Sequence, residues 1–139
     1  MHSIRFGDSR VTKCLEGGRL LPGETLFVSG PDSFDCMRFL ISCMQCQQYQ
    51  MISQSTRGMV WLSDLMESLA SLDSLCVKPV VVVLDFPLSV LRDFRVKTME
   101  DLLERLCSEK TTIITNCAPM ERVATQRIVF AGDGAVFKR

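Results

Sequence analysis

The stretch that decides the fold is "PVVVVLDF", residues 79–86. From Val80 to Leu84 the run is aliphatic throughout, and Asp85 follows it directly. A strand with one solvent-facing side alternates apolar and polar residues, whereas a strand that is covered on both faces is apolar at every position. The run therefore predicts a central strand of a parallel sheet, with Asp85 at the carboxyl end of that strand.

The segments on either side of this run alternate between strand and helix patterns. Short apolar runs predict strands at 25–30, 58–63 and 111–116. Helical spacing of apolar residues predicts helices at 33–50, 64–72 and 98–110. Residues 127–139 carry two short apolar runs around Gly-Asp-Gly, which is typical of a β-hairpin. Together these elements predict a three-layer α/β domain, helix–sheet–helix, with a mostly parallel sheet and a C-terminal β-hairpin.

The length of 139 residues predicts a single domain, 1–139, in which 1–14 is expected to be a flexible or partner-docking segment. Sixteen basic residues balance sixteen acidic ones, so the chain alone is not expected to attract DNA or anionic lipid strongly. No apolar run is long enough to span a membrane, and "MHSIRFGDSR" lacks the apolar stretch of a secretory signal. We expect no membrane association.

The cysteines indicate free thiols in a reducing compartment. There are seven, an odd number, and several lie in apolar segments. Cys43 and Cys46 form a C-x-x-C pair, but no second pair accompanies them, and His2 is the single histidine. Zinc sites need four such ligands, so we expect no metal site.

The segment "VSGPDSFDCM", residues 28–37, has the position of a phosphate-binding loop, because a strand leads into Gly30 and a helix follows. A P-loop has the pattern G-x-x-x-x-G-K-[ST]. Counted from Gly30, the second glycine is replaced by Asp35, the lysine by Cys36 and the hydroxyl residue by Met37. Alternatively, the segment is an ordinary strand-to-helix turn that Asp32 or Ser33 caps.

These replacements remove the chemistry of the loop. A carboxylate about 4 Å from one phosphate charge costs about 4 kcal/mol at an effective dielectric constant near 20. Cys36 offers no cation and Met37 no hydroxyl for Mg²⁺. Since about 1.4 kcal/mol is tenfold in affinity, ATP binding should be at least about a thousandfold weaker than in an intact loop. We therefore expect no nucleotide cofactor and no hydrolysis.

Four segments in order resemble the core of the RecA-type recombinases, specifically their eukaryotic paralogues. They are "LEGGRLLPGETLFVSG", "GPDSFDCM", "VVVVLDF" and "TTIITN", and the match spans roughly residues 15–139. The resemblance implies a RecA-like P-loop NTPase core with a degenerate nucleotide site. It implies a non-catalytic, nuclear protein that pairs with another paralogue as a heterodimer. Such a pair would assemble, cap or remodel recombinase filaments on single-stranded DNA in homologous recombination and DNA repair.

The same resemblance assigns roles to particular residues. In the family, the acidic residue at the position of Asp85 holds Mg²⁺ through water. Without a P-loop lysine and hydroxyl, we expect Asp85, Phe86 and Pro87 to contact a partner subunit. For Asp85 the alternatives are a cap on the next turn and a residual contact with nucleotide. The two loops that line the DNA channel in recombinases correspond here to segments with candidate single-stranded DNA contacts. These candidates are Arg92, Arg95, Lys97, Arg122 and Arg127, and solvated surface charge is the alternative explanation for them.

Two other functions are compatible with the pattern. RecA-like folds without nucleotide sites also occur as bacterial cell-division inhibitors that bind a tubulin-like filament protein, although the "LEGGRLLPGE" lead-in favours the recombinase paralogues. A small P-loop ATPase with an atypical loop is the other alternative, and the residues at 35–37 argue against it. The identity of a co-purifying partner, a recombinase or a division protein, distinguishes the recombinase paralogue from the cell-division inhibitor. ATP turnover tests whether the chain is a small ATPase.

Overall fold

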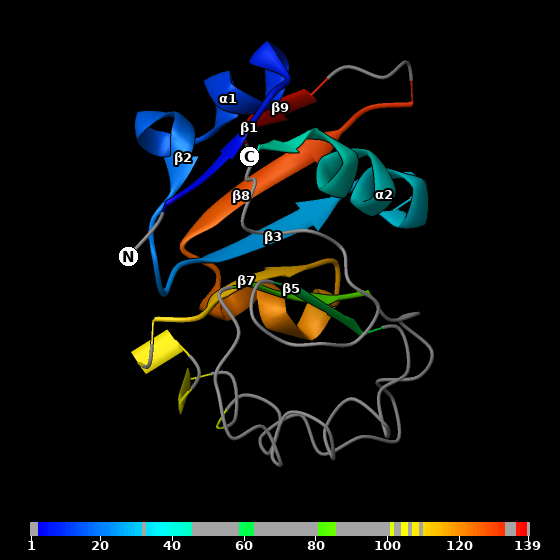
Figure 1. Cartoon of the computed structure of the whole chain (residues 1–139). Helices are drawn as coiled ribbons and strands as arrows, with labels where there is room; N and C mark the ends of the chain where they lie inside the picture. The colour runs from blue at the N-terminus through cyan, green and yellow to red at the C-terminus, as the bar shows by residue number, and fades with distance from the viewer. Residues whose placement is uncertain are drawn as a thin grey trace.

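A six-stranded sheet is the centre of the computed structural model (Figure 1). The structure describes residues 3–31, 33–45, 59–62, 81–85, 101, 104–105, 107–108, 110–132 and 136–138. The strands are β3 (Thr25–Ser29), β5 (Met59–Leu62), β6 (Val81–Leu84), β7 (Thr112–Thr115), β8 (Gln126–Phe130) and β9 (Val136–Lys138). They are arranged in the order β5-β6-β7-β3-β8-β9. All neighbours pair in parallel except β8 and β9, which form an antiparallel hairpin. The prediction of an α/β fold with a mostly parallel sheet and a C-terminal hairpin is confirmed.

The run that predicted a central strand has that position. β6 lies between β5 and β7 and pairs with both in parallel. Val81, Val82 and Val83 are fully buried, so side chains that point to opposite faces of the sheet are both covered. The unbroken aliphatic sequence is explained by this two-sided burial.

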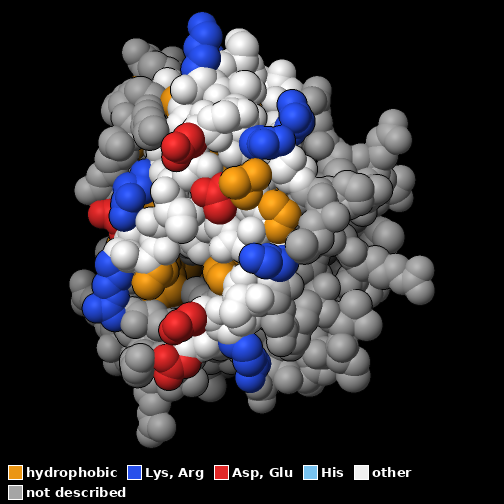
Figure 2. All heavy atoms as spheres, turned by 90° about the vertical axis from the view of Figure 1, so that its left-hand side faces the viewer, with side chains coloured by type: hydrophobic (Ala, Val, Ile, Leu, Met, Phe, Trp, Pro, Cys, Tyr) orange, Lys and Arg blue, Asp and Glu red, His pale blue; other side chains and the backbone are white. Residues whose placement is uncertain are grey.

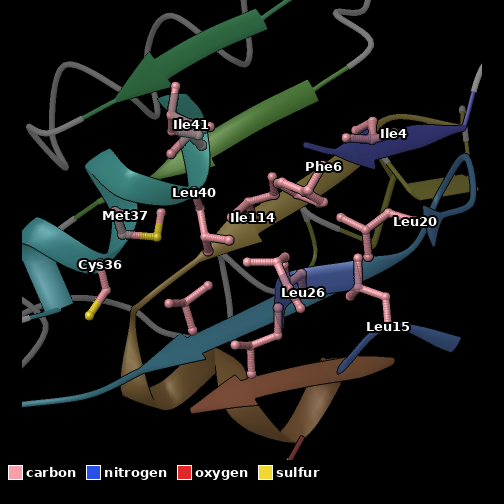
Figure 3. Packing of buried hydrophobic residues seen from close by; sticks show 14 of the residues in the cluster. Ile4, Phe6, Leu15, Leu20, Leu26, Cys36, Met37, Leu40, Ile41 and Ile114 are labelled. Carbon is pink, nitrogen blue, oxygen red and sulfur yellow. The ribbon is translucent and has the colours of Figure 1, made fainter. Parts of the chain in front are cut away.

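Alternate residues along the other strands show the same two-sided core. In β3, Leu26 and Val28 belong to one apolar cluster with α2 (Ser33–Cys43), whereas Phe27 points to the other face and is also buried. Leu40 of α2 lies over Ile114 of β7 in this cluster (Figure 3). On the opposite face the 3-10 helix η3 (Ala118–Val123) contributes a fully buried Met120.

The amino-terminal residues form a second, smaller sheet that the sequence did not predict. It has the order β2-β1-β4, from β1 (Ile4–Phe6), β2 (Arg19–Leu20) and β4 (Met44–Gln45). The short helix α1 (Ser9–Cys14) follows β1 and contacts β9. We expected 1–14 to be a flexible or partner-docking segment, but Ile4 and Val11 are fully buried and Phe6 is 4% exposed. These residues belong to the core.

The helix expected over 33–50 is shorter in the structure. α2 ends at Cys43, and the next residues form β4, which pairs antiparallel with β1. The Gly7 N–H donates a hydrogen bond to the Cys43 carbonyl at the junction. Pairing with β1 thus overrides the helical pattern that continues beyond Cys43, a tertiary effect that local spacing does not report.

Of the other predicted elements, some are confirmed by the structure and one lies outside the residues that it describes. The strands expected at 25–30, 58–63 and 111–116 correspond to β3, β5 and β7. In the helix expected at 98–110, the described residues Asp101, Glu104, Arg105, Cys107 and Ser108 are helical. The helix expected at 64–72 lies outside the described residues.

Candidate functional site

The carboxyl ends of the parallel strands form the candidate site. β3 and β7 are neighbours in the sheet, but the chain continues from them in opposite directions. After β3 the chain forms α2 and later β5, which is the edge strand on the β7 side. After β7 it forms η3 and then β8, which lies on the far side of β3. In open α/β sheets, ligands bind outside the carboxyl ends of the strands at such a switch point. Gly30, Asp85 and Asn116 follow β3, β6 and β7 directly, so the topology brings these three residues to one edge of the sheet.

Gly30 is a glycine because β8 ends against it. A methyl group at this position would lie 2.9 Å from the Phe130 carbonyl oxygen, 3.0 Å from the Phe130 Cβ and 3.1 Å from the Cys36 Sγ. Two of these three atoms are fixed by the Phe130 backbone. Close packing therefore accounts for the glycine without a bound phosphate.

The positions that carry lysine and a hydroxyl in a P-loop face the core here. Cys36 is 8% exposed and Met37 is fully buried, and both belong to the apolar cluster beneath α2 (Figure 3). Asp35, at the position of the second P-loop glycine, is exposed in the first turn of α2. No cation or hydroxyl from these three positions faces the loop. Asp32, one of the two expected caps, lies outside the described residues, and Ser33 is the first residue of α2.

Asp85 is joined to the end of the neighbouring strand. The Asn116 Nδ2 donates a hydrogen bond of 2.6 Å to the Asp85 Oδ1, and Asp85 is only 3% exposed. The Cys117 N–H donates to the Thr115 Oγ1 at 3.0 Å and shapes the same turn. Asp85 therefore holds the ends of β6 and β7 together and presents almost no surface. Phe86 and Pro87, the other two expected partner contacts, lie outside the described residues.

The pairing of Asp85 with Asn116 was not predicted from the sequence. The signal was available, because each residue follows a buried strand and the two strands are expected in one parallel sheet. The sequence does not say, however, that β6 and β7 are direct neighbours. That adjacency is what brings the carboxylate and the amide into contact.

The lead-in "EGGRLLPGE" has a structural role at the other end of the sheet. The Gln126 Oε1 accepts a hydrogen bond of 2.7 Å from the Glu16 N–H, and the Gln126 Nε2 donates to the Arg19 carbonyl at 3.2 Å. The same amide donates to the Glu24 carboxylate at 3.2 Å. Gly17 and Gly18 have φ angles of 67° and 72°, a region that favours glycine. The first residue of β8 thus clamps the turn that leads into β3.

The structure places only two of the basic residues proposed for DNA contact. Arg122 is exposed on η3, and Arg127 on β8 donates a hydrogen bond of 2.9 Å from its Nη2 to the Glu121 carbonyl. Arg127 is in register with Phe27 in the middle of β3, not with Gly30 beyond its end. Arg92, Arg95 and Lys97 lie outside the described residues. On the molecular face in Figure 2, basic and acidic side chains are interspersed.

The cysteines that the structure describes form no disulfides with one another: Cys14, Cys36, Cys43, Cys107 and Cys117. Burial raises the pKa of the Cys43 and Cys107 thiols above the ordinary value. A raised pKa lowers the thiolate fraction at neutral pH, so these two sulfurs are weak nucleophiles. Among the described residues, no group of three or more His, Cys, Asp or Glu side chains is placed to hold a metal ion.

Comparison of the chain with family models, curated proteins and solved structures finds no match. In the described part of the chain, no helix has both the length and the apolar character needed to cross a bilayer. Three features of the chain bear on its function: the sheet order, the loop after β3 and the four sequence segments quoted above.

Proposed function

We propose that this chain is a non-catalytic, RecA-like recombinase paralogue. It pairs with another paralogue and, through that partner, helps to assemble, cap or remodel a recombinase filament on single-stranded DNA. The observation that carries the proposal is the loop after β3: a P-loop position at the switch point of a parallel sheet, whose lysine and hydroxyl positions hold the buried Cys36 and Met37.

The sheet supports the RecA-like assignment. A P-loop connects a parallel strand to a helix, and it binds its ligand at the carboxyl ends of the strands. Here β3 lies between β7 and β8, both parallel to it, and it leads through Gly30 into α2. The acidic residue expected after the second family strand is Asp85, at the same edge of the sheet. This arrangement agrees with the order of segments on which the resemblance is based.

The burial of Cys36 and Met37 supports a role without catalysis. A side chain at either position that reached toward a phosphate would leave the apolar cluster, and the cluster would lose that buried surface. Asp35 adds a negative charge in the first turn of α2, where a P-loop needs glycine and a bound anion. The chain therefore acts through its surface, and ATP bound by the partner paralogue supplies any nucleotide dependence.

The partner contact is assigned to the segment that begins at Asp85. Because the Asp85 carboxylate is buried against Asn116, its part is to position the residues that follow, Phe86 and Pro87. Asp85→Ala removes this anchor and should weaken pairing. Arg122→Ala, an exposed change on η3, is the matched control and should leave pairing unchanged.

The experiment is affinity purification of the tagged full chain from a whole-cell extract, with identification of co-purifying proteins by mass spectrometry. We expect a recombinase paralogue in near-stoichiometric amount, and less of it with Asp85→Ala. Recovery of a tubulin-like filament protein in its place would overturn the proposal in favour of the cell-division alternative.

A second measurement tests the loss of the nucleotide site. In equilibrium binding of labelled ATP with Mg²⁺ to the isolated chain, we expect no saturation in the micromolar range. Micromolar affinity, or ATP turnover above the background of a mock preparation, would contradict the assignment as a non-catalytic subunit.

A further inference from the structure

A pocket of about 300 Å³ opens between α1, α2 and the end of β8, beside the loop that follows β3. Its lining residues are Arg10, Pro31, Asp35, Cys36, Phe39, Phe130, Ala131 and Gly132. This volume is at the lower limit for small-molecule pockets, and a cavity of about 150 Å³ already accepts benzene. The pocket thus has room for one aromatic ring or a fused pair of rings.

Two aromatic side chains provide the apolar part of the lining. The rings of Phe39 and Phe130 meet edge to face, with centroids 5.8 Å apart and planes at 84°. In this geometry the pair combines ring edges and ring faces, both of which attract another ring in stacked or edge-on contact. Phe39 comes from α2 and Phe130 from β8, so the position of the pair depends on the fold and not on a loop.

A fixed cation completes the lining. The Arg10 guanidinium carbon lies 5.6 Å from the centroid of the Phe39 ring. Asp8 holds this guanidinium through two hydrogen bonds, from Nε at 3.1 Å and from Nη2 at 2.9 Å. A guanidinium that is held in place loses little entropy when a ring stacks against it, and its charge favours the face of an aromatic ring.

We propose that this pocket is a binding site for a small, uncharged aromatic molecule of one ring or two fused rings. Aromaticity is selected by the Arg10 cation and by the Phe39–Phe130 pair. Neutrality is selected because an anion would meet the exposed Asp35 carboxylate and a cation would meet Arg10. The site is independent of the proposed pairing with a recombinase paralogue, since Asp85, Phe86 and Pro87, the residues assigned to that pairing, are not among the lining residues of the pocket.

Gly132 allows the pocket to be filled by a single change. Among the described residues, a Cβ at this exposed position would meet only the Pro31 Cγ, at 3.8 Å, which is an ordinary contact. A phenylalanine at position 132 thus starts from a Cβ that clears the described backbone, and we expect its ring to cover the opening of the pocket. Arg10→Gln removes the cation from an exposed side chain, and Arg122→Gln is the matched control because it removes an exposed arginine outside the pocket.

The test is saturation-transfer NMR of the full chain with indole and phenol as probes, and with cyclohexanol as the aliphatic partner of phenol. We expect saturable binding of indole and phenol in the millimolar range and at least about fivefold weaker binding of cyclohexanol. Gly132→Phe should abolish indole binding. Arg10→Gln should weaken it about two- to fivefold, the effect of one cation–π contact, and Arg122→Gln should leave it unchanged.

Any of four results would overturn the proposal. The first is absence of saturable transfer to indole and phenol at several millimolar, and the second is equal binding of cyclohexanol and phenol. The third is indole binding that persists in Gly132→Phe, which would place the ligand elsewhere. A capped phenylalanine peptide that binds much more tightly than indole would replace the small molecule with a partner's side chain as the occupant. Thermal melting of each variant by circular dichroism reports whether it is folded.

Discussion

Replacing Gly30 with alanine tests whether this glycine is retained for packing. The added methyl would lie 2.9 Å from the Phe130 carbonyl oxygen and 3.0 Å from the Phe130 Cβ. Both atoms belong to the last residue of β8, which is held in the sheet by pairing with β3 and with β9. Neither can rotate away, so β3 and β8 must separate locally or α2 must shift.

The size of the effect follows from that geometry. Forcing an extra methyl into a close-packed core costs about 1–3 kcal/mol, and here the neighbour is backbone, so we expect at least about 2 kcal/mol. The contact with the Cys36 Sγ at 3.1 Å adds a smaller part, because a side chain can move more easily than a strand. With a urea m-value of about 1–3 kcal/mol per molar, the midpoint of unfolding should fall by about 1 M.

Urea unfolding followed by far-UV circular dichroism measures this change, and Gly132→Ala is the matched control. A Cβ at Gly132 would come no closer than 3.8 Å to any atom in the part of the chain that the structure describes. Alanine there reduces the conformational freedom of the unfolded chain and should stabilise the protein by about 0.4–1 kcal/mol. If Gly30 is retained for packing, the free energy of unfolding should fall in Gly30→Ala and rise in Gly132→Ala. If Gly30→Ala changed the free energy of unfolding by less than about 0.3 kcal/mol, the packing explanation would be wrong.

Three further predictions concern other parts of the fold. Met37→Ser, which places a hydroxyl at the P-loop position, should lower the free energy of unfolding by about 2–5 kcal/mol in urea titrations because Met37 is fully buried. Met37→Leu should lower it by less than about 1.5 kcal/mol. Equal effects of the two variants would mean that Met37 is not part of the packed core. Gln126→Leu should lower the free energy of unfolding by about 1–3 kcal/mol in the same assay, since it removes the Oε1 that accepts the hydrogen bond from the Glu16 N–H; a neutral result would mean that these Gln126 hydrogen bonds do not stabilise the fold. The side-chain hydrogen bond from Arg10 lowers the pKa of Asp8 from 3.8 to about 2. As the pH falls, the unfolded chain therefore binds the proton first, and the folded state loses this stabilisation. The melting temperature of the wild type should exceed that of Asp8→Asn above about pH 4, and the difference should vanish toward pH 2.

The sequence predicted the larger sheet because its strands are buried on both faces. Such strands show short, continuous runs of aliphatic residues, as at Val81–Leu84, or of β-branched residues, as at Thr112–Thr115, and runs of this length are typical of strands. The hairpin of β8 and β9 was predicted from Gly-Asp-Gly between two short runs, a signal that is equally local. In both cases the information lies within a few residues of the element.

The smaller sheet could not be predicted in the same way. β1 has three residues, and β2 and β4 have two each, which is too short for any periodicity to be visible. These strands exist because Ile4, Phe6 and Leu20 are buried against the domain, and their partners along the chain are distant. The end of α2 at Cys43 has the same cause, because Met44 pairs with Phe6 across the sheet.

At the candidate site, the sequence showed which residues stand at the P-loop positions counted from Gly30, but not what these residues do in the fold. Cys36 and Met37 are neighbours on one helix, and side chains at adjacent positions point about 100° apart, so a wide apolar stripe is needed to bury both. That stripe exists because α2 is covered by the sheet on one side and is approached on another by Gly30, after β3, and by Phe130, at the end of β8. Only the assembled fold shows this second contact.

In our proposal, the same two side chains, Cys36 and Met37, both remove the nucleotide site and pack the edge of the sheet at the carboxyl ends of its parallel strands. A lysine at position 36 would have to leave the contact with Gly30 and Phe130, and a serine at position 37 would give up most of a buried side chain that is worth about 1.5–3 kcal/mol. Restoring the phosphate chemistry would thus reduce the stability of a domain of 139 residues, in which a few kcal/mol is a large share of the total. A chain that functions by pairing has no phosphate contact to offset that cost. The apolar residues at these positions are then maintained by the fold itself, whichever partner the surface binds.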